Sequence, residues 1–314
     1  MSGWGAADIP DQTDRRAVVT GANSGLGLAV ARELTRAGAC VVMACRSPDK
    51  GRRAVEEVCR VVAEPCVHLE QLDLADLSSV RDFAERLSYS HDRVDVLVNN
   101  AGIMAPPRRE TVDGFESQLG TNHLGHFALT GRLLPLLSAA PAPRVVTLSS
   151  IMHRIGRLRL DDLQMRRRYV NWLAYGQSKL ANLMFAVELS RRATAAGSPV
   201  LSVAAHPGYA ATNLQFAAPA TRLERGSMWV MNQTIAQSAD AGALPALYAA
   251  TTPGLPGGSF VGPDGFMELR GHPRLTRGAA RAYDEAAGRA LWERSEELTD
   301  VRYDFTHDRP GHLG

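Results

Sequence analysis

Short apolar runs alternate with longer amphipathic segments along most of this chain. The first run, residues 16–20, is followed by a glycine-rich turn and then by a segment with apolar residues at helical spacing as far as residue 37. Repetition of strand and helix is typical of a parallel sheet, because each helix returns the chain to the edge where the next strand begins. The pattern predicts an α/β fold: a Rossmann-type doubly wound parallel sheet of about seven strands with helices on both faces, in a single domain.

The same pattern gives approximate bounds for the elements. Strands are expected at residues 16–20, 41–44, 67–72, 94–98, 144–148 and 200–204, with an edge strand at 260–261. Helices are expected at residues 48–62, 78–87, 115–137, 180–196 and 279–297. The chain then divides into a polar N-terminal arm (1–15), a sheet domain (16–270) and a C-terminal extension with one helix (271–314).

Composition and charge narrow the class of protein. The 314 residues are 45% hydrophobic and 22% charged, which is ordinary for a globular protein with a sizeable core. A formal net charge of +2 gives no reason to expect a nucleic-acid partner, and no apolar run approaches the ~18 residues of a membrane span. The first 16 residues are polar, unlike a signal or transit peptide. We therefore expect a cytoplasmic protein that binds neither nucleic acid nor membrane.

Four cysteines fall close together, at Cys40, Cys45, Cys59 and Cys66. They form no C-x-x-C pair, and no histidine cluster lies beside them. Cys40 and Cys45 flank an apolar run, where cysteine usually serves as a small hydrophobic side chain. We interpret the cysteines as structural and expect no metal site.

The glycine-rich turn after the first strand has the spacing G-x-x-x-G-x-G. Glycine suits such a turn because it adopts backbone angles that other residues avoid. Strand, glycine turn and helix together form the start of a nucleotide-binding unit, in which a pyrophosphate lies against N–H groups at the helix N-terminus. The residues expected to hold a dinucleotide there are Gly21, Asn23, Ser24, Gly25, Leu26 and Gly27.

The end of the second strand bears on the choice between NAD and NADP. NAD-specific sites have an acidic residue about 20 positions past the glycines, which accepts a hydrogen bond from the ribose 2′-OH. This chain has Ala44, Cys45 and Arg46 there, so no carboxylate repels a 2′-phosphate, and Arg46 could bind it with support from Lys50. We expect NADP(H) to be preferred over NAD(H). The alternative is that Arg46 is a solvated arginine at a strand end.

Tyr175 and Lys179 are four residues apart, which places them on one face of a helix. A cation one turn away stabilises the phenolate and lowers the tyrosine pKa, so that tyrosine acts as an acid or base closer to neutral pH. The lysine is conspicuous because 33 of the 35 basic residues are arginine. An exposed polar pair on a helix is the alternative.

Eight short motifs lie in order between residues 20 and 208. They are T-G-A-N-S-G-L-G from 20, A-C-R from 44, D-L from 73, N-N-A-G from 99, N-H-L-G-H-F from 122, S-S from 149, Y-G-Q-S-K from 175 and H-P-G from 206. Together they resemble the short-chain dehydrogenase/reductase family, nearest to its retinol-dehydrogenase-like branch.

The resemblance implies roles for four polar residues. In that family a tyrosine is the general acid/base, and a lysine binds the nicotinamide ribose and lowers the tyrosine pKa. A serine polarises the carbonyl, and an asparagine completes a proton relay through water. These roles fall on Tyr175, Lys179, Ser150 and Asn122. Ser149 competes with Ser150, which is preferred because the family uses the second position of this strand end.

The resemblance also implies further cofactor contacts. It assigns the adenine contact to Asp73 and Leu74, the floor of the cofactor site to Asn100, Ala101 and Gly102, and the nicotinamide side to Pro207, Gly208 and Thr212. Membrane-bound members of the branch carry an apolar N-terminal anchor, which has no counterpart in the printed sequence.

Two segments should meet over the nicotinamide: an insertion at 151–174 and a segment resembling a substrate lid at 213–233. The insertion carries Arg154, Arg157, Arg159 and the run 166–168, which would bind an anionic group or simply face solvent. The apolar residues of both segments predict a bulky hydrophobic substrate, unless they pack on one another or form an oligomer contact. They are Ile151, Met152, Leu173, Leu214, Phe216, Met228, Trp229 and Met231.

The sequence as a whole predicts an NADP(H)-dependent oxidoreductase that interconverts a carbonyl and an alcohol. The alternative is a non-catalytic NADP(H)-binding sensor or scaffold, although such proteins typically lose the tyrosine or the lysine. His123, His126 and His153 are interpreted as packing or hydrogen-bonding residues, because Tyr175 is available as the acid. The substrate, the direction of reaction and a homodimer or homotetramer stay open.

Overall fold

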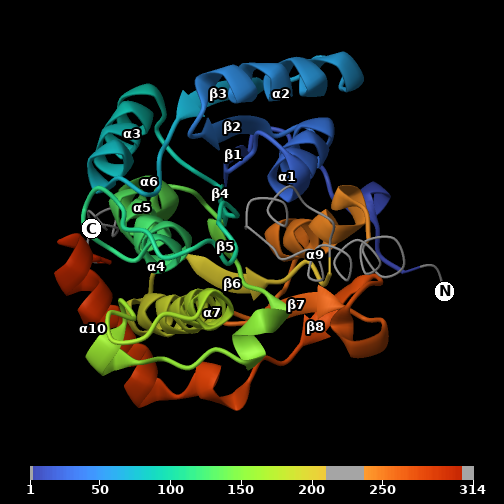
Figure 1. The fold of residues 1–314 in the computed structure, drawn as a ribbon. Coiled ribbons are helices and arrows are strands. Elements are labelled where there is room, and N and C mark those ends of the chain that lie inside the picture. Colours follow the sequence, from blue (N-terminus) through green and yellow to red (C-terminus); the bar gives the residue numbers. More distant parts are fainter. Residues whose placement is uncertain (1–2, 210–236, 306–314) are drawn as a thin grey trace, which may run out of the picture.

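The structure is a computed structural model that describes residues 3–209 and 237–305. One sheet of eight strands crosses the molecule in the order β3-β2-β1-β4-β5-β6-β7-β8 (Figure 1). Seven strands are parallel, and β8 pairs antiparallel with β7. The strands are β1 (Arg16–Thr20), β2 (Cys40–Cys45), β3 (Val67–Gln71), β4 (Val96–Asn99), β5 (Arg144–Leu148), β6 (Leu201–Ala205), β7 (Phe260–Pro263) and β8 (Pro273–Thr276). The predicted Rossmann-type fold is confirmed.

The predicted edge strand at 260–261 is not at the edge. β8 lies outside β7, with Leu275 opposite Val261. Two of the four side chains of β8 are exposed, so its sequence shows no buried-strand pattern. The sheet therefore gains its last strand from a segment that was expected to contain only a helix.

Helices cover both faces of the sheet (Figure 1). Helices α1 (Gly25–Arg36), α2 (Pro48–Val61) and α9 (Ala239–Thr251) pack on one face. Helices α3 (Leu77–Ser90), α5 (Gly125–Arg132), α6 (Leu134–Ser138) and α7 (Asn171–Ala196) pack on the other, where α10 (Glu285–Thr299) covers α5 and α7. The sequence pattern missed α9, which contains Pro245. Among the described residues, none of the helices is both long and apolar enough to cross a membrane.

The long helix predicted at 115–137 is present as a nearly continuous helical run over residues 117–138, which contains one π-helical turn. It consists of α4 (Ser117–Leu119), a π-helical turn (Gly120–Leu124), α5 and α6. Gly125 lies against the backbone of Leu74, where a Cβ atom would come within 2.3 Å of the Leu74 carbonyl oxygen. The π-helical turn contains Asn122, so this local change in helix geometry falls at a predicted catalytic residue.

Two cysteines are paired, contrary to the interpretation of Cys40 as a small hydrophobic side chain. Cys40 and Cys66 form a disulfide across 26 positions of the chain. The pairing follows from the sheet, because β2 and β3 are parallel with Val41 opposite Val67, which brings the preceding residues together. Cys45 is buried and free, as expected, and Cys59 is free and exposed.

The strand order reverses between β1 and β4, because the chain adds β2 and β3 on one side of β1 and the later strands on the other. Ligands of open α/β sheets bind at such a reversal, beyond the carboxyl ends of the strands. The glycine turn follows β1 and the N-N-A-G motif ends β4, so both lie at this point.

Candidate active site

The four predicted catalytic residues are polar and buried. Ser150 lies just beyond the end of β5, Tyr175 and Lys179 lie in the first turns of α7, and Asn122 lies in the π-helical turn. A Cβ atom on Gly102 would lie 3.1 Å from Asn122 Oδ1 and 3.5 Å from Lys179 Nζ. Three separate elements therefore bring polar groups to one small region beside the N-N-A-G motif.

The two neighbouring serines face in different directions. Ser149 Oγ donates a hydrogen bond to the Lys179 carbonyl at 2.8 Å, so it is used in holding α7 against β5. Ser150 Oγ accepts a hydrogen bond from the Met152 N–H at 3.3 Å, and the Ser150 side chain is close enough to Tyr175 to lower its pKa against the effect of burial. The geometry therefore favours Ser150 over Ser149 as the partner of the tyrosine.

Burial dominates the proton affinities of the tyrosine and lysine. It raises the pKa of Tyr175 to about 12, an effect that the nearby Ser150 side chain offsets only in part. It lowers the pKa of Lys179 to about 8. Lys179 Nζ lies 5.9 Å from the centroid of the Tyr175 ring and donates to the Leu148 carbonyl at 3.1 Å. The structure does not show the expected lowering of the tyrosine pKa by lysine, because burial raises that pKa and only the Ser150 side chain opposes it.

Asn122 is held through its side chain. Its Oδ1 accepts from the Ile103 N–H at 2.8 Å, while its Nδ2 donates to the Ile103 carbonyl at 3.0 Å and to Ser178 Oγ at 2.9 Å. The side chain therefore fastens the π-helical turn both to the segment after the N-N-A-G motif and to the catalytic helix.

The main-chain carbonyl of Asn122 faces His126 Nδ1 at 2.9 Å, and His126 Nε2 faces Thr20 Oγ1 at 2.9 Å. A carbonyl can only accept, so Nδ1 carries the proton and Nε2 accepts from the Thr20 hydroxyl. Burial lowers the pKa of His126 to about 3, which keeps the ring neutral. Thr20 Oγ1 in turn accepts from the N–H groups of Asn100 and Ala101 at 2.9 and 3.0 Å.

This chain of hydrogen bonds joins the asparagine turn to the glycine turn and to the end of β4. The sequence interpretation gave Thr20 no role, although it is the first residue of the T-G-A-N motif. His126 was interpreted as a packing or hydrogen-bonding residue, and the structure confirms that.

The turn after β1 fits a dinucleotide. Gly21 has a φ of 66°, and a Cβ atom there would lie 2.9 Å from the Ala101 Cα atom. A Cβ atom on Gly27 would lie 2.5 Å from Asn100 Nδ2. Helix α1 begins at Gly25, and Ser24 makes no side-chain cap, so the first N–H groups of the helix are available for a pyrophosphate. The predicted residues 21–27 thus form a tight cradle, in which positions 21 and 27 have no room for a side chain.

Arg46 is exposed just past the end of β2, and it makes no hydrogen bond or ion pair with any described residue. Asp73 follows β3, where its carboxylate accepts from the Ala75 N–H at 3.0 Å, and Leu74 is buried beside it. These residues follow strands at the same edge of the sheet as the glycine turn.

On the nicotinamide side, Gly208 has a φ of 66°, and the Pro207 carbonyl accepts from Gln237 Nε2 at 2.5 Å. Thr212 and the predicted lid at 213–233 lie outside the described residues.

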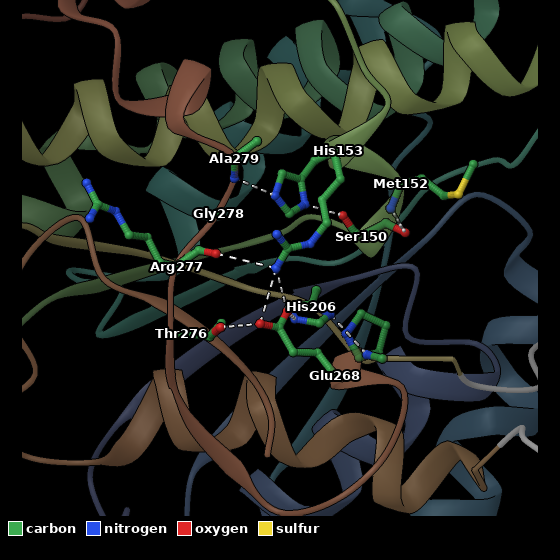
Figure 2. A network of polar contacts seen from close by, with 12 residues as sticks. Ser150, Met152, His153, His206, Glu268, Thr276, Arg277, Gly278 and Ala279 are labelled. Atoms are coloured by element: carbon green, nitrogen blue, oxygen red, sulfur yellow. Dashed lines mark hydrogen bonds and ion pairs between the residues drawn. The ribbon is translucent and has the colours of Figure 1, made fainter. Parts of the chain in front are cut away.

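A partly buried carboxylate that the sequence did not suggest holds the H-P-G motif (Figure 2). Glu268 accepts from His206 Nε2 at 3.1 Å, from Thr276 Oγ1 at 2.5 Å and from the Arg154 guanidinium at 3.1 Å. The His206 hydrogen bond is the main reason that the pKa of Glu268 falls to about 2. Arg154 of the insertion is therefore paired with protein, whereas it had been considered for an anionic substrate group or solvent.

Trp172 is a third residue that the sequence interpretation missed. Its ring stands edge-on to Tyr175 at 6.3 Å between centroids, and 37% of the residue is exposed. It precedes Tyr175 by three positions in α7, so helical spacing could have found it. The neighbouring Leu173, predicted to line the substrate region, is 38% exposed.

Comparison with known proteins identifies the family. The family model described as short chain dehydrogenase matches residues 15–222. The chain belongs to that family. The match covers every predicted site residue and most of the parallel sheet, so this short chain dehydrogenase is an oxidoreductase by family.

Curated relatives place it near the retinol-dehydrogenase-like branch. Retinol dehydrogenase 12 of Mus musculus is 48% identical over 191 residues, which cover 61% of this chain and 60% of that protein. Retinol dehydrogenase 13 of Homo sapiens is 37% identical over 307 residues, which cover 97% and 89%. Polyprenol dehydrogenase of Mus musculus is 38% identical over 304 residues, which cover 93% and 85%.

Solved structures share the fold. An uncharacterized protein from Mycobacterium paratuberculosis is 50% identical with a TM-score of 0.80, covering 96% of this short chain dehydrogenase and 100% of that chain. A Beutenbergia cavernae protein described as an NAD(P) dependent gluconate 5-dehydrogenase, with NADP bound at low occupancy, is 28% identical with a TM-score of 0.62. That match covers 77% of this chain and 91% of the other.

Proposed function

We propose that this short chain dehydrogenase interconverts a carbonyl and a primary or secondary alcohol on a bulky apolar molecule, with NADP(H) as the cofactor and Tyr175 as general acid/base. The observation that supports this most is a pair of buried hydroxyls, Ser150 and Tyr175, close enough that the Ser150 hydroxyl acts on the Tyr175 pKa, beside the cradle for a dinucleotide. Two hydroxyl donors in a water-poor site can stabilise negative charge on a substrate oxygen.

The residues have separate tasks in this scheme. The nicotinamide, when bound, supplies or accepts the hydride at the substrate carbon. In reduction Tyr175 delivers a proton to the substrate oxygen, and in oxidation it removes one. Ser150 can donate to the same oxygen because its Oγ accepts from Met152 and thus keeps its own hydrogen available. Lys179 and Asn122 both lie beside Gly102. Lys179 would bind the nicotinamide ribose, and Asn122 would take part in the proton relay.

The proposed preference for NADP(H) rests on Arg46. Its side chain is exposed at the edge where the adenosine end of the cofactor would lie, and no acidic residue occupies positions 44–46. An arginine beside a 2′-phosphate provides a charge-assisted contact that a 2′-OH cannot match. A related structure that contains bound NADP supports the same choice.

The proposed substrate class rests on the exposed apolar residues Trp172 and Leu173, one turn before Tyr175, and on the partly buried Ile151 and Met152 just after Ser150. Apolar surface beside the reactive hydroxyls favours a substrate with apolar bulk next to its carbonyl. Two relatives are named for retinol and polyprenol, both apolar alcohols.

The test is a set of aldehydes and ketones of increasing apolar size, assayed by loss of NADPH absorbance with wild type and with Tyr175→Phe. We expect kcat/KM to rise with size for wild type. The phenylalanine variant should lose at least about a hundredfold in kcat while it binds NADPH nearly as well, because only the proton donor is removed.

Two results would contradict the proposal. Binding of NADPH without turnover on any carbonyl or alcohol would favour the sensor or scaffold instead. Values of kcat/KM that fall with substrate size would reject the apolar substrate class.

A further inference from the structure

His153 lies buried between the catalytic serine and the C-terminal segment (Figure 2). Its Nδ1 lies 2.6 Å from the Ser150 carbonyl oxygen, and its Nε2 lies 3.0 Å from the main-chain nitrogen of Ala279. The ring also stands edge-on against Phe260 at 5.3 Å. One imidazole thus touches the end of β5, the start of β7 and the segment after β8.

The partners of the two ring nitrogens define the tautomer. The Ala279 N–H can only donate, so Nε2 has a lone pair and accepts. The Ser150 carbonyl can only accept, so Nδ1 carries the hydrogen and donates. Both nitrogens are satisfied by a neutral ring, and burial keeps it neutral by lowering the pKa of His153 to about 4.

The Ser150 peptide is held from both sides. Its carbonyl accepts from the His153 ring and, at 3.0 Å, from the His153 N–H. Its Oγ caps the 3₁₀ turn Ile151–Arg154 by accepting from Met152. The direction of the Ser150 hydroxyl therefore depends on the orientation of a peptide that the imidazole fixes.

The C-terminal segment can approach the ring because of a glycine. A Cβ atom on Gly278 would lie 3.3 Å from His153 Nε2, tighter than most Cβ contacts. The same Cβ atom would lie 2.4 Å from Leu183 Cδ2, so a glycine at position 278 helps the segment to pack close to the ring. Tyr283 supports the same segment, since its hydroxyl accepts from the Gly278 N–H at 3.0 Å.

We propose that His153 is a positioning residue for catalysis: it donates to the Ser150 carbonyl and so aims the Ser150 hydroxyl at the substrate oxygen, while the Ala279 N–H holds the imidazole in the donating tautomer. The inference rests on the proposed function, since it concerns the carbonyl-binding serine of that reaction. It assigns the segment at 276–283 a part in the active site that the sequence pattern does not show.

Two nearly isosteric substitutions separate the two hydrogen bonds. In His153→Asn the amide nitrogen takes the place of Nδ1 and can still donate to Ser150, but nothing reaches Ala279. In His153→Gln the amide oxygen takes the place of Nε2 and can still accept from Ala279, but the Ser150 carbonyl loses its side-chain donor. His153→Phe loses both and keeps the ring packing against Phe260.

We expect His153→Gln and His153→Phe to lower kcat by about tenfold or more, with the Kd for NADPH within about twofold of wild type. His153→Asn should keep kcat within about threefold of wild type. Equal losses of kcat in the asparagine and glutamine variants would overturn the proposal. So would losses of kcat that simply follow the melting temperature of each variant, as a purely structural histidine would predict.

A double-mutant cycle with Ser150→Ala provides a second measurement. Once the hydroxyl is gone, its direction no longer matters, so His153→Gln should change kcat by less than about twofold in that background. A loss in the Ser150→Ala background as large as in wild type would contradict the proposed action through Ser150.

The tautomer can be tested without turnover. Imidazole ¹⁵N chemical shifts of wild type should show His153 protonated at Nδ1 and bare at Nε2, and a ring protonated at Nε2 would reject the inference. An enzyme that shows this tautomer but reduces no carbonyl would contradict the proposed function and not the geometry around His153. A wild type that is active on carbonyls, together with asparagine and glutamine variants of equally reduced kcat, would support the proposed function and contradict the proposed role of His153.

Discussion

Lys179 is a buried ammonium whose nearest protein partner is a neutral carbonyl. Removing a charge from water costs free energy that one hydrogen bond to a carbonyl does not restore, which is why the lysine pKa falls from 10.5 to about 8. The fold thus carries an electrostatic cost at this position, as often occurs where a group is placed for chemistry.

The size of that cost should depend on pH. Below pH 8 lysine is protonated in both folded and unfolded chains, so the full cost of the buried charge is present. Between pH 8 and 10.5 the folded protein loses the proton first, and the cost shrinks as pH rises. We expect Lys179→Met to raise the free energy of unfolding by about 3 kcal/mol near pH 7 and by only about 1 kcal/mol near pH 9.5.

Urea unfolding of both proteins at the two pH values measures this difference. Packing by the new methionine contributes equally at both, so the change in the difference is the informative quantity. A gain that stays constant with pH would show that the Lys179 pKa is not lowered in the folded protein.

Arg46 should account for cofactor preference. A charge-assisted contact with the 2′-phosphate contributes ~1.5 to 3 kcal/mol, roughly tenfold to a hundredfold in affinity. We expect Arg46→Ala to weaken NADPH binding by that factor and to leave NADH binding nearly unchanged. Fluorescence titration of both cofactors tests this expectation. The matched control is Arg52→Ala, which removes an exposed arginine of α2. Equal affinities of wild type for NADH and NADPH would refute the preference.

At the scale of elements, β1 and β5 have the bounds that the hydrophobic pattern predicted. Both are short and almost fully buried, so their sequences carry a clear signal. The pattern failed where an element depends on its surroundings. The close approach of Gly125 to Leu74 joins residues that are distant in sequence, and β8 is half exposed and, among the described strands, pairs only with β7.

The disulfide joins two neighbouring strands. It should stabilise the folded protein because it restricts the conformations of the unfolded chain. Closing a loop of 26 residues lowers the entropy of the unfolded state by an amount worth about 3.5 kcal/mol. We expect Cys40→Ser to lower the free energy of unfolding by about that much in the absence of reductant. Cys59→Ser, at an exposed free cysteine, should change it by less than about 0.5 kcal/mol.

Adding a reductant to wild type is the complementary measurement. Wild type should then approach the stability of Cys40→Ser. If reduction leaves the stability of wild type unchanged, the bond does not stabilise the folded protein.

At the scale of the whole molecule, the predicted catalytic residues lie near one another because their motifs follow neighbouring parallel strands at one edge of the sheet. The order of the motifs in the sequence was enough to predict this. Their supports could not be predicted in the same way. Glu268 reaches His206 and Arg154 from the loop after β7, and Ala279 reaches His153 from beyond β8. Such contacts follow from tertiary packing, and neither periodicity nor local spacing in the sequence encodes them.

The bond between Ala279 and His153 connects residues 126 positions apart, and this separation has a consequence in time. A ribosome adds ~5–20 residues per second, so about 6 to 25 seconds pass between the synthesis of the histidine and of its partner. All residues of the glycine cradle are made before either one. A nascent chain therefore contains the glycine turn for nucleotide binding well before Ala279 is available to hydrogen-bond His153. A product that terminates before Ala279 would lack the proposed support for Ser150.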